Sequence, residues 1–161
     1  MKIDPLTTKR CLIREIETAD TEQIVLWRSD PNVYKYFKYP VKIDHNHHLK
    51  WFKDSYLPNE NRIDFIAILK ESNKKIGLFG INRLDNESAE LSYLLDNDYH
   101  GKGFASEIIG ELEDFFSKKW GIKLFLAEIH KDNVKSIKFI EKIGYVKLES
   151  RKYFSIYGKK I

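Results

Sequence analysis

The chain has 161 residues, of which 42% are hydrophobic and 32% are charged, and its formal net charge is +4. This length suits a single domain over residues 1–161, and the density of charge excludes a membrane-spanning helix. Charges of both signs are interspersed, so we expect no nucleic-acid partner, whereas a polyphosphate ligand would suit the positive balance. The chain has one cysteine and no leader-like start, which favours a cytoplasmic protein.

The first third of the chain predicts one strand and two helices. Lys9–Ile16 is rich in β-forming residues and predicts the first strand. Asp20, with a glutamine three residues later, has the spacing of a capping box and predicts a short helix that stops before Pro31. An aromatic-rich segment follows. Asp44 then predicts the cap of a second helix that runs to about Tyr56.

The centre of the chain predicts a mixed sheet. Ile63–Leu69 and Ile76–Asn82 flank a polar turn and predict a hairpin, and Ala89–Leu95 predicts the next strand. An apolar stripe at helical spacing predicts a long helix over Phe104–Trp120, and this crossover would set Lys123–His130 parallel to the strand before it. The expected fold is α+β: antiparallel strands one to four, a parallel strand five, and helices on both faces.

Two glycines mark the turn between the fourth strand and the long helix. Gly101 and Gly103 leave consecutive backbone N–H groups free at a helix N-terminus, where the helix dipole also favours an anion. Glycine lets a phosphate approach the backbone closely, because it has no Cβ. The turn therefore predicts a phosphate-binding site.

Two known phosphate-binding turns fit this site poorly. A nucleoside-triphosphate loop needs Lys and then Ser or Thr after its last glycine, but Phe104 and Ala105 follow here. A dinucleotide-binding turn needs a third glycine where this chain has Ser106. Glu128 could still serve as the acid that binds a ribose, so an NAD-dependent oxidoreductase remains a remote alternative.

Two motifs carry a more specific resemblance. His100-Gly101-Lys102-Gly103-Phe104-Ala105 resembles the pyrophosphate turn of the GCN5-related N-acetyltransferase (GNAT) family, with His100 in the place of the usual Gln or Arg. Asn133, Ser136, Lys142, Gly144 and Tyr145 match the family's second motif. The phrase YHGKGFASE is most similar to the branch that acetylates ribosomal-protein N-termini, polyamines and amino-sugar nucleotides.

The resemblance implies a GNAT-like sheet that binds acetyl-CoA as a cosubstrate, without a metal. It implies that the pantetheine arm lies along the fourth strand and that the turn binds the pyrophosphate. The residues assigned to the cofactor are Leu94, Leu95, His100, Gly101, Lys102, Gly103, Phe104, Ala105, Ser106, Asn133, Ser136 and Lys142. Asn133 also has the position of an N-cap, which is compatible with that role.

Direct acetyl transfer needs a base, because a free alkylamine has a pKa near ~10.4. The resemblance places Glu90 in this role, with Glu128 and His130 as competitors. The proton donor to the departing sulfur falls to Ser136 or to water, because Ile140 stands where many relatives have a tyrosine.

The acceptor is expected to be a small-molecule or peptide amine bound by Tyr34 to Tyr39 and by the helix that carries His47, His48 and Trp51. This region resembles the amino-sugar-nucleotide acetyltransferases, which makes such a nucleotide the expected acceptor. A protein N-terminus, a polyamine, an antibiotic or a non-catalytic CoA-binding role remain as alternatives.

The C-terminus departs from the family pattern, because only three residues follow Gly158, where the usual turn glycine would fall. Either the last hairpin turns near Ser150-Arg151 and returns over Tyr153 to Tyr157, or the final strand is missing. A missing strand would expose a sheet edge and favour a homodimer.

Overall fold

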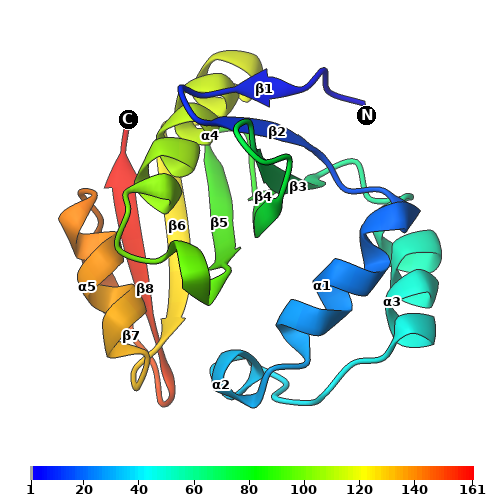
Figure 1. The fold of residues 1–161 in the computed structure, drawn as a ribbon. Coiled ribbons are helices and arrows are strands. Elements are labelled where there is room, and N and C mark those ends of the chain that lie inside the picture. The colour runs from blue at the N-terminus through cyan, green and yellow to red at the C-terminus, as the bar shows by residue number, and fades with distance from the viewer. Residues whose placement is uncertain (1) are drawn as a thin grey trace.

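The computed structural model describes residues 2–161 and contains one eight-stranded sheet in the order β1-β2-β3-β4-β5-β6-β8-β7 (Figure 1). The strands are β1 (Leu6–Thr7), β2 (Cys11–Glu15), β3 (Arg62–Leu69), β4 (Lys75–Arg83), β5 (Ser88–Leu95), β6 (Leu124–His130), β7 (Val146–Ser150) and β8 (Phe154–Lys160). Neighbouring strands are antiparallel except β5 and β6, which are parallel. The predicted α+β fold is confirmed, and the short β1 is an addition to it.

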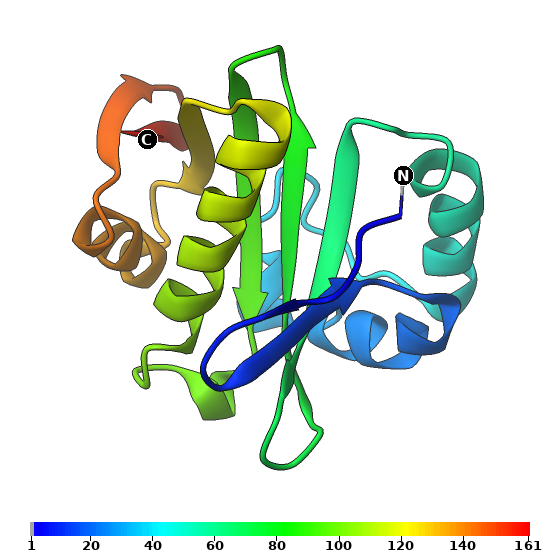
Figure 2. The same cartoon turned by 90° about the horizontal axis from the view of Figure 1, so that it is seen from above.

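Helices cover both faces of the sheet, as predicted. They are α1 (Thr21–Arg28), α2 (Pro31–Tyr34), α3 (His45–Trp51), α4 (Phe104–Trp120) and α5 (Val134–Lys142). Figure 2 shows α4 and α5 on one side and α1 and α3 on the other. Alternation along each strand supplies both cores: Phe65 packs with the α4 side, whereas Ile66 packs with the α1 side.

The parallel pair β5–β6 is short. Within the described residues, Cα partners are found only at Ser88↔Leu124, Ala89↔Phe125 and Glu90↔Leu126, so the two strands separate beyond Glu90. The other edge of β6 pairs with β8 over its full length. The second half of β5 therefore has an edge without a strand partner, in the middle of the sheet.

The long helix α4 has the predicted bounds. Gly103 at its start and Gly121 after its end both adopt left-handed backbone angles, with φ of +80° and +71°. Such angles favour glycine and end a helix sharply, so both boundaries can be read from local sequence.

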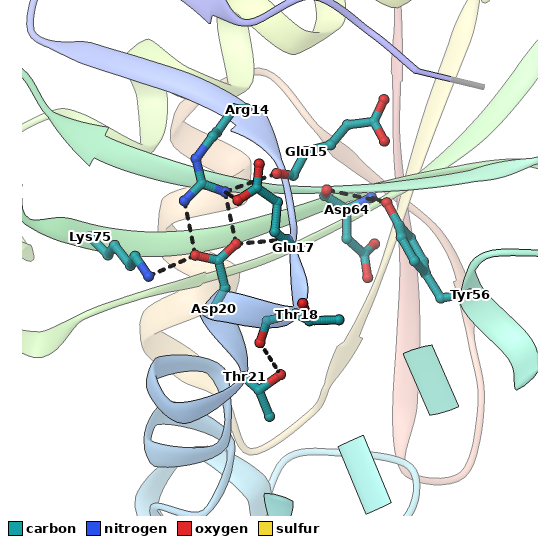
Figure 3. Close-up of polar contacts among 9 residues, drawn as sticks. All are labelled: Arg14, Glu15, Glu17, Thr18, Asp20, Thr21, Tyr56, Asp64 and Lys75. Carbon is teal, nitrogen blue, oxygen red and sulfur yellow. Dashed lines mark hydrogen bonds and ion pairs between the residues drawn. The ribbon is translucent and has the colours of Figure 1, made fainter. Parts of the chain in front are cut away.

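Asp20 was wrongly expected to cap α1, because it makes no side-chain cap bond there. It belongs instead to a capping box one turn earlier, where it accepts a hydrogen bond from the Glu17 N–H at 2.8 Å. Its carboxylate is fully buried and bound by Arg14 at 2.8 and 2.9 Å and by Lys75 at 2.7 Å (Figure 3). Two cations nearby in space hold a carboxylate more strongly than the local helix amides do.

The second helix is capped as predicted, since Asp44 accepts from the His47 N–H at 2.8 Å. Its last turn, Phe52–Tyr56, widens into a π-helix.

At the C-terminus, the first alternative is confirmed: the last hairpin turns after Ser150, and β8 lies between β6 and β7. Gly158 is inside β8 and not in a turn. A Cβ there would lie 2.5 Å from Leu148 Cδ1, so the exposed Leu148 side chain packs over this glycine.

Candidate functional site

The turn between β5 and α4 has the backbone that an anion site needs. Gly101 and Gly103 have φ of +73° and +80°, and both are exposed. Within residues 2–161, no hydrogen-bond acceptor is found for the backbone N–H groups of Gly101, Lys102 and Gly103. The first-turn amides of α4 add further free donors. The turn thus presents a group of unpaired N–H donors to solvent.

Arg10, from the start of the chain, holds this turn in place. Its Nη1 donates to the Lys102 carbonyl at 3.0 Å, and its Nε pairs with Glu107 Oε1 at 2.9 Å. The guanidinium lies 3.9 Å from the centre of the Phe104 ring. Burial by itself would raise the pKa of Glu107. Hydrogen bonds from Thr8 and Arg10 lower it by a larger amount, so the pKa of this carboxyl is below its usual value. The sequence analysis missed Arg10 because its partners are distant in sequence.

The predicted phosphate ligands divide into two groups. His100 Nε2 lies 2.8 Å from the Leu95 carbonyl, and Lys102 Nζ donates to the Asp98 carbonyl at 3.0 Å, so both side chains bind within the turn itself. Ser106 and Lys142 instead line a groove of about 290 Å³ between α4 and α5. The structure therefore brings these two residues together on the helix side of the turn.

Only alternate residues of β5 direct their backbone N–H and C=O groups towards its unpaired edge. Ser88 O accepts from Leu84 N, and Asp96 N donates to Ile76 O, so even-numbered residues of β5 bond towards β4. By alternation, the backbone groups of Tyr93 and Leu95 point to the side where β6 has separated. Of the two predicted pantetheine contacts, Leu95 has this orientation and Leu94 does not.

Ser136 contacts a residue that the sequence analysis did not select. Its hydroxyl lies 2.5 Å from the Tyr93 hydroxyl, which joins β5 to the first turn of α5. Burial raises the pKa of Tyr93 to about 12, and the hydrogen bond with Ser136 opposes this rise. Asn133 caps α5 by accepting from the Ser136 N–H at 3.3 Å, so its predicted N-cap role is confirmed.

Charged side chains gather on the α1 face of the sheet. Arg62, Asn82 and Glu90 are Cα partners in one row across β3, β4 and β5, and Glu128 is two residues beyond the partner of Glu90 on β6. Glu128 forms an ion pair with Lys38 at 2.8 Å. Glu90 has no hydrogen-bond partner among the described residues. Burial raises its pKa, and the charge of Glu128 adds to this, although Lys38 and Arg62 oppose it.

Gly80 makes room for a second charged pair beside this row. Asp64 is buried and paired with Arg62 through two contacts of 3.0 and 3.1 Å. A Cβ on Gly80 would lie 2.6 Å from both Asp64 Oδ1 and Ser92 Oγ, so the Asp64 carboxylate lies over this glycine. Ser92 is exposed although it is on a central strand. The α1 face is therefore open to solvent at this point.

The predicted acceptor region is only partly brought to this face. Tyr36 packs against His130 with ring centres 5.8 Å apart, and Lys38 reaches Glu128. His130 Nδ1 accepts from the Asp132 N–H at 3.1 Å, so a neutral ring carries its proton on Nε2 and is poorly placed as a base.

Of the helix residues in the predicted acceptor region, Trp51 reaches this face, because the Arg62 guanidinium lies 5.5 Å from the centre of its ring. His48 is buried and packs against Trp51 at 5.4 Å, whereas His47 is exposed beside Asp44.

Two further features concern metal binding and membrane insertion. Among residues 2–161, no group of three or more His, Cys, Asp or Glu side chains could hold a metal ion. No helix in this part of the chain is both long and apolar enough to cross a membrane.

Comparison with known proteins places this arrangement in context. The family profile described as "Acetyltransferase (GNAT) domain" matches residues 10–146. The uncharacterized N-acetyltransferase p20 of Bacillus licheniformis is 30% identical over 151 residues, which cover 90% of this chain and 84% of that protein. The uncharacterized protein MJ1062 of Methanocaldococcus jannaschii is 31% identical over 144 residues; the match covers 86% of this chain but 28% of that longer protein.

A solved structure shows the same fold. RimL, a ribosomal L7/L12 alpha-N-protein acetyltransferase in complex with coenzyme A, superposes with a TM-score of 0.83 over 98% of both chains. Its sequence identity is 12%, so this likeness concerns the fold alone.

Proposed function

Because the chain belongs to the GNAT acetyltransferase family, we propose that it transfers an acetyl group from acetyl-CoA directly to a primary amine, with an amino-sugar nucleotide as the acceptor. The observation that carries this proposal is the separation of β5 from β6. It leaves an unpaired strand edge between an anion-binding turn at one end and the carboxylate of Glu90 at the other.

The cosubstrate would occupy this edge and the turn. Pantetheine contains amide groups, which can bond to the backbone groups of Tyr93 and to the Leu95 N–H as an added strand would, whereas the Leu95 carbonyl already contacts His100 Nε2. The N–H groups from Gly101 to Ser106 would bind the pyrophosphate, aided by the α4 dipole. Ser106 and Lys142, which line the groove between α4 and α5, would contact the phosphate-bearing part of the cosubstrate that lies beyond the pyrophosphate.

Glu90 is the proposed base. Among residues 2–161 it has no hydrogen-bond or ion-pair partner, its pKa is raised, and it lies on the α1 face at the point where the strands separate. Glu128 is a weaker candidate because its carboxylate is already bound by Lys38 at 2.8 Å. A bound amine would lose its proton to Glu90, directly or through a water molecule.

Two other steps of the transfer need groups from this chain: stabilisation of the thioester oxygen and protonation of the departing sulfur. A free N–H of the β5 edge would stabilise charge on the thioester oxygen; where such donors have been removed, the loss is about 3–4 kcal/mol. The Ser136 hydroxyl, held by Tyr93, would donate a proton to the departing sulfur. Asn133 would hold the first turn of α5 in position for this contact.

The acceptor class depends on a likeness of residues 30–52 to amino-sugar-nucleotide enzymes. Tyr36 and Phe37 offer aromatic faces on the side of the sheet that carries Glu90, and such faces suit a sugar ring or a nucleobase. A protein N-terminus or a polyamine would need a different contact set. Each belongs in the experimental comparison.

Thermal unfolding with ligands tests the proposal. Acetyl-CoA should raise the melting temperature, and NAD should not, because only a ligand of the folded state stabilises it. A panel of amino-sugar nucleotides, polyamines and peptides, with thiol release as the readout, then separates an enzyme from a CoA-binding domain without activity. Stabilisation by NAD alone would refute the proposal.

A further inference from the structure

Two charged groups on the α1 face lack a partner. Among the described residues, neither Glu90 nor Arg28 forms an ion pair or a hydrogen bond through its side chain. The other charges nearby are already paired, since Arg62 binds Asp64 and Lys38 binds Glu128. One carboxylate and one guanidinium are thus left without a partner on the same face.

Arg28 is the last residue of α1, and its surroundings limit its access to solvent. Its guanidinium lies 5.4 Å from the centre of the Phe37 ring. Burial lowers the pKa of Arg28. The nearby charge of Asp64 opposes this, whereas the charge of Arg62 adds to it. Asp64 is already bound by Arg62 at 3.0 Å, so the Arg28 guanidinium has no direct ion-pair partner among the described residues.

A partly buried charge without a partner is unfavourable, and this cost falls when an anion binds. The C-terminal end of α1 attracts a cation, which is the purely structural explanation. That explanation requires only a positive charge and predicts no ligand. The fork of guanidinium donors, by contrast, matches a phosphate or a carboxylate.

We propose that the amine acceptor carries an anionic group, a phosphate or a carboxylate, which Arg28 binds while Glu90 receives the amine. This inference rests on the proposed function and assigns a residue to the recognition of its acceptor. Arg28 is then a specificity-determining residue. An amino-sugar nucleotide meets the requirement through its diphosphate, whereas a polyamine does not.

Three amines with the same two-carbon spacing test this directly: ethanolamine, phosphoethanolamine and β-alanine. Binding is measured by calorimetry with CoA present, so that the anions do not enter the cofactor turn. Phosphoethanolamine or β-alanine should bind at least about tenfold tighter than ethanolamine, which corresponds to one bidentate contact. The preferred member of the pair identifies the anion as phosphate or carboxylate.

Arg28→Gln should remove this preference, and Arg28→Lys should restore part of it. Arg83→Gln is the matched control, because Arg83 lies over Trp120 on the other side of the sheet. The inference is overturned if the wild-type protein shows no preference for an anionic amine, or if Arg28→Gln keeps it. The melting shift with CoA alone is measured first for every variant. It reports separately on folding and on the proposed cofactor, so its failure is distinct from failure of the inference.

Discussion

The hydroxyl groups of Tyr93 and Ser136 lie 2.5 Å apart and connect β5 with α5 across the region where β5 and β6 separate. The Tyr93 ring also packs edge-on against Phe139, with ring centres 5.4 Å apart. The orientation of the Ser136 hydroxyl is therefore set by a strand as well as by its own helix. A proton donor in this position would be held in place before any ligand binds.

Ser136→Ala should lower kcat by about tenfold. This is less than the 10² typical of general acid catalysis, because a thiol has a pKa near ~8.5 and its thiolate departs with little help. Cofactor affinity should hardly change. Tyr93→Phe is the companion variant and should cost about 1 kcal/mol of stability by removing one hydrogen bond. If Ser136→Ala loses stability but keeps its turnover, the serine serves only as a structural contact.

Glu90→Gln should lower kcat by a factor on the order of 10². The carboxylate must be ionised to act as a base, and the pKa of Glu90 is raised above its usual 4.5. The kcat of the parent should therefore decline as the pH falls through this raised pKa, and the variant should lack that decline. Glu128→Gln is the comparison, and an equal loss there would move the base to Glu128.

The same Glu90 variant should be more stable at neutral pH. A carboxyl whose folded-state pKa exceeds the unfolded value is destabilised when it ionises, so the neutral glutamine avoids this cost. Its melting temperature at pH 7 should exceed that of the parent, and this difference should shrink at acidic pH. A lower melting temperature at pH 7 would mean that Glu90 has a stabilising partner.

Gly103→Asp should abolish stabilisation by acetyl-CoA, because a carboxylate would stand where the phosphate is expected and the backbone has φ of +80°. Gly121→Asp is a matched control at the other end of α4, with φ of +71° and open space around a Cβ. Both variants should lose a similar amount of stability, but only the first should lose the ligand response. Equal ligand responses would exclude the turn as the phosphate site.

Asp20→Asn should destabilise the fold by about 2 kcal/mol at pH 7, which corresponds to the lowering of the Asp20 pKa from 3.8 to about 2. Burial opposes this lowering, but the hydrogen bonds from Arg14 and Lys75 prevail. The stabilisation is complete above the unfolded pKa and is lost as the pH falls from about 4 towards 2. Urea unfolding over this range measures it. Asp114→Asn, in an exposed pair with Lys118, should have no measurable effect.

Local sequence was sufficient for most of the elements, though not for β1, and for the position of the glycine turn that we propose as the anion site. The bounds of α4 follow from an apolar stripe between two glycines, and Asp44 caps α3 as expected. The central hairpin and the parallel crossover follow from strand patterns and chain connectivity. These features depend on backbone angles and side-chain periodicity, which residues a few positions apart determine.

Tertiary structure decided which side chains meet. Arg10 reaches Lys102 across 92 positions, and Tyr93 reaches Ser136 across 43. Asp20 binds Arg14 and Lys75 rather than capping its helix, and Glu128 is paired while Glu90 has no partner in the part of the chain that the structure describes. No local pattern encodes these choices, because the partner of a charged or hydroxyl group depends on distance in space and on burial, and both arise only when the sheet and its two layers of helices assemble.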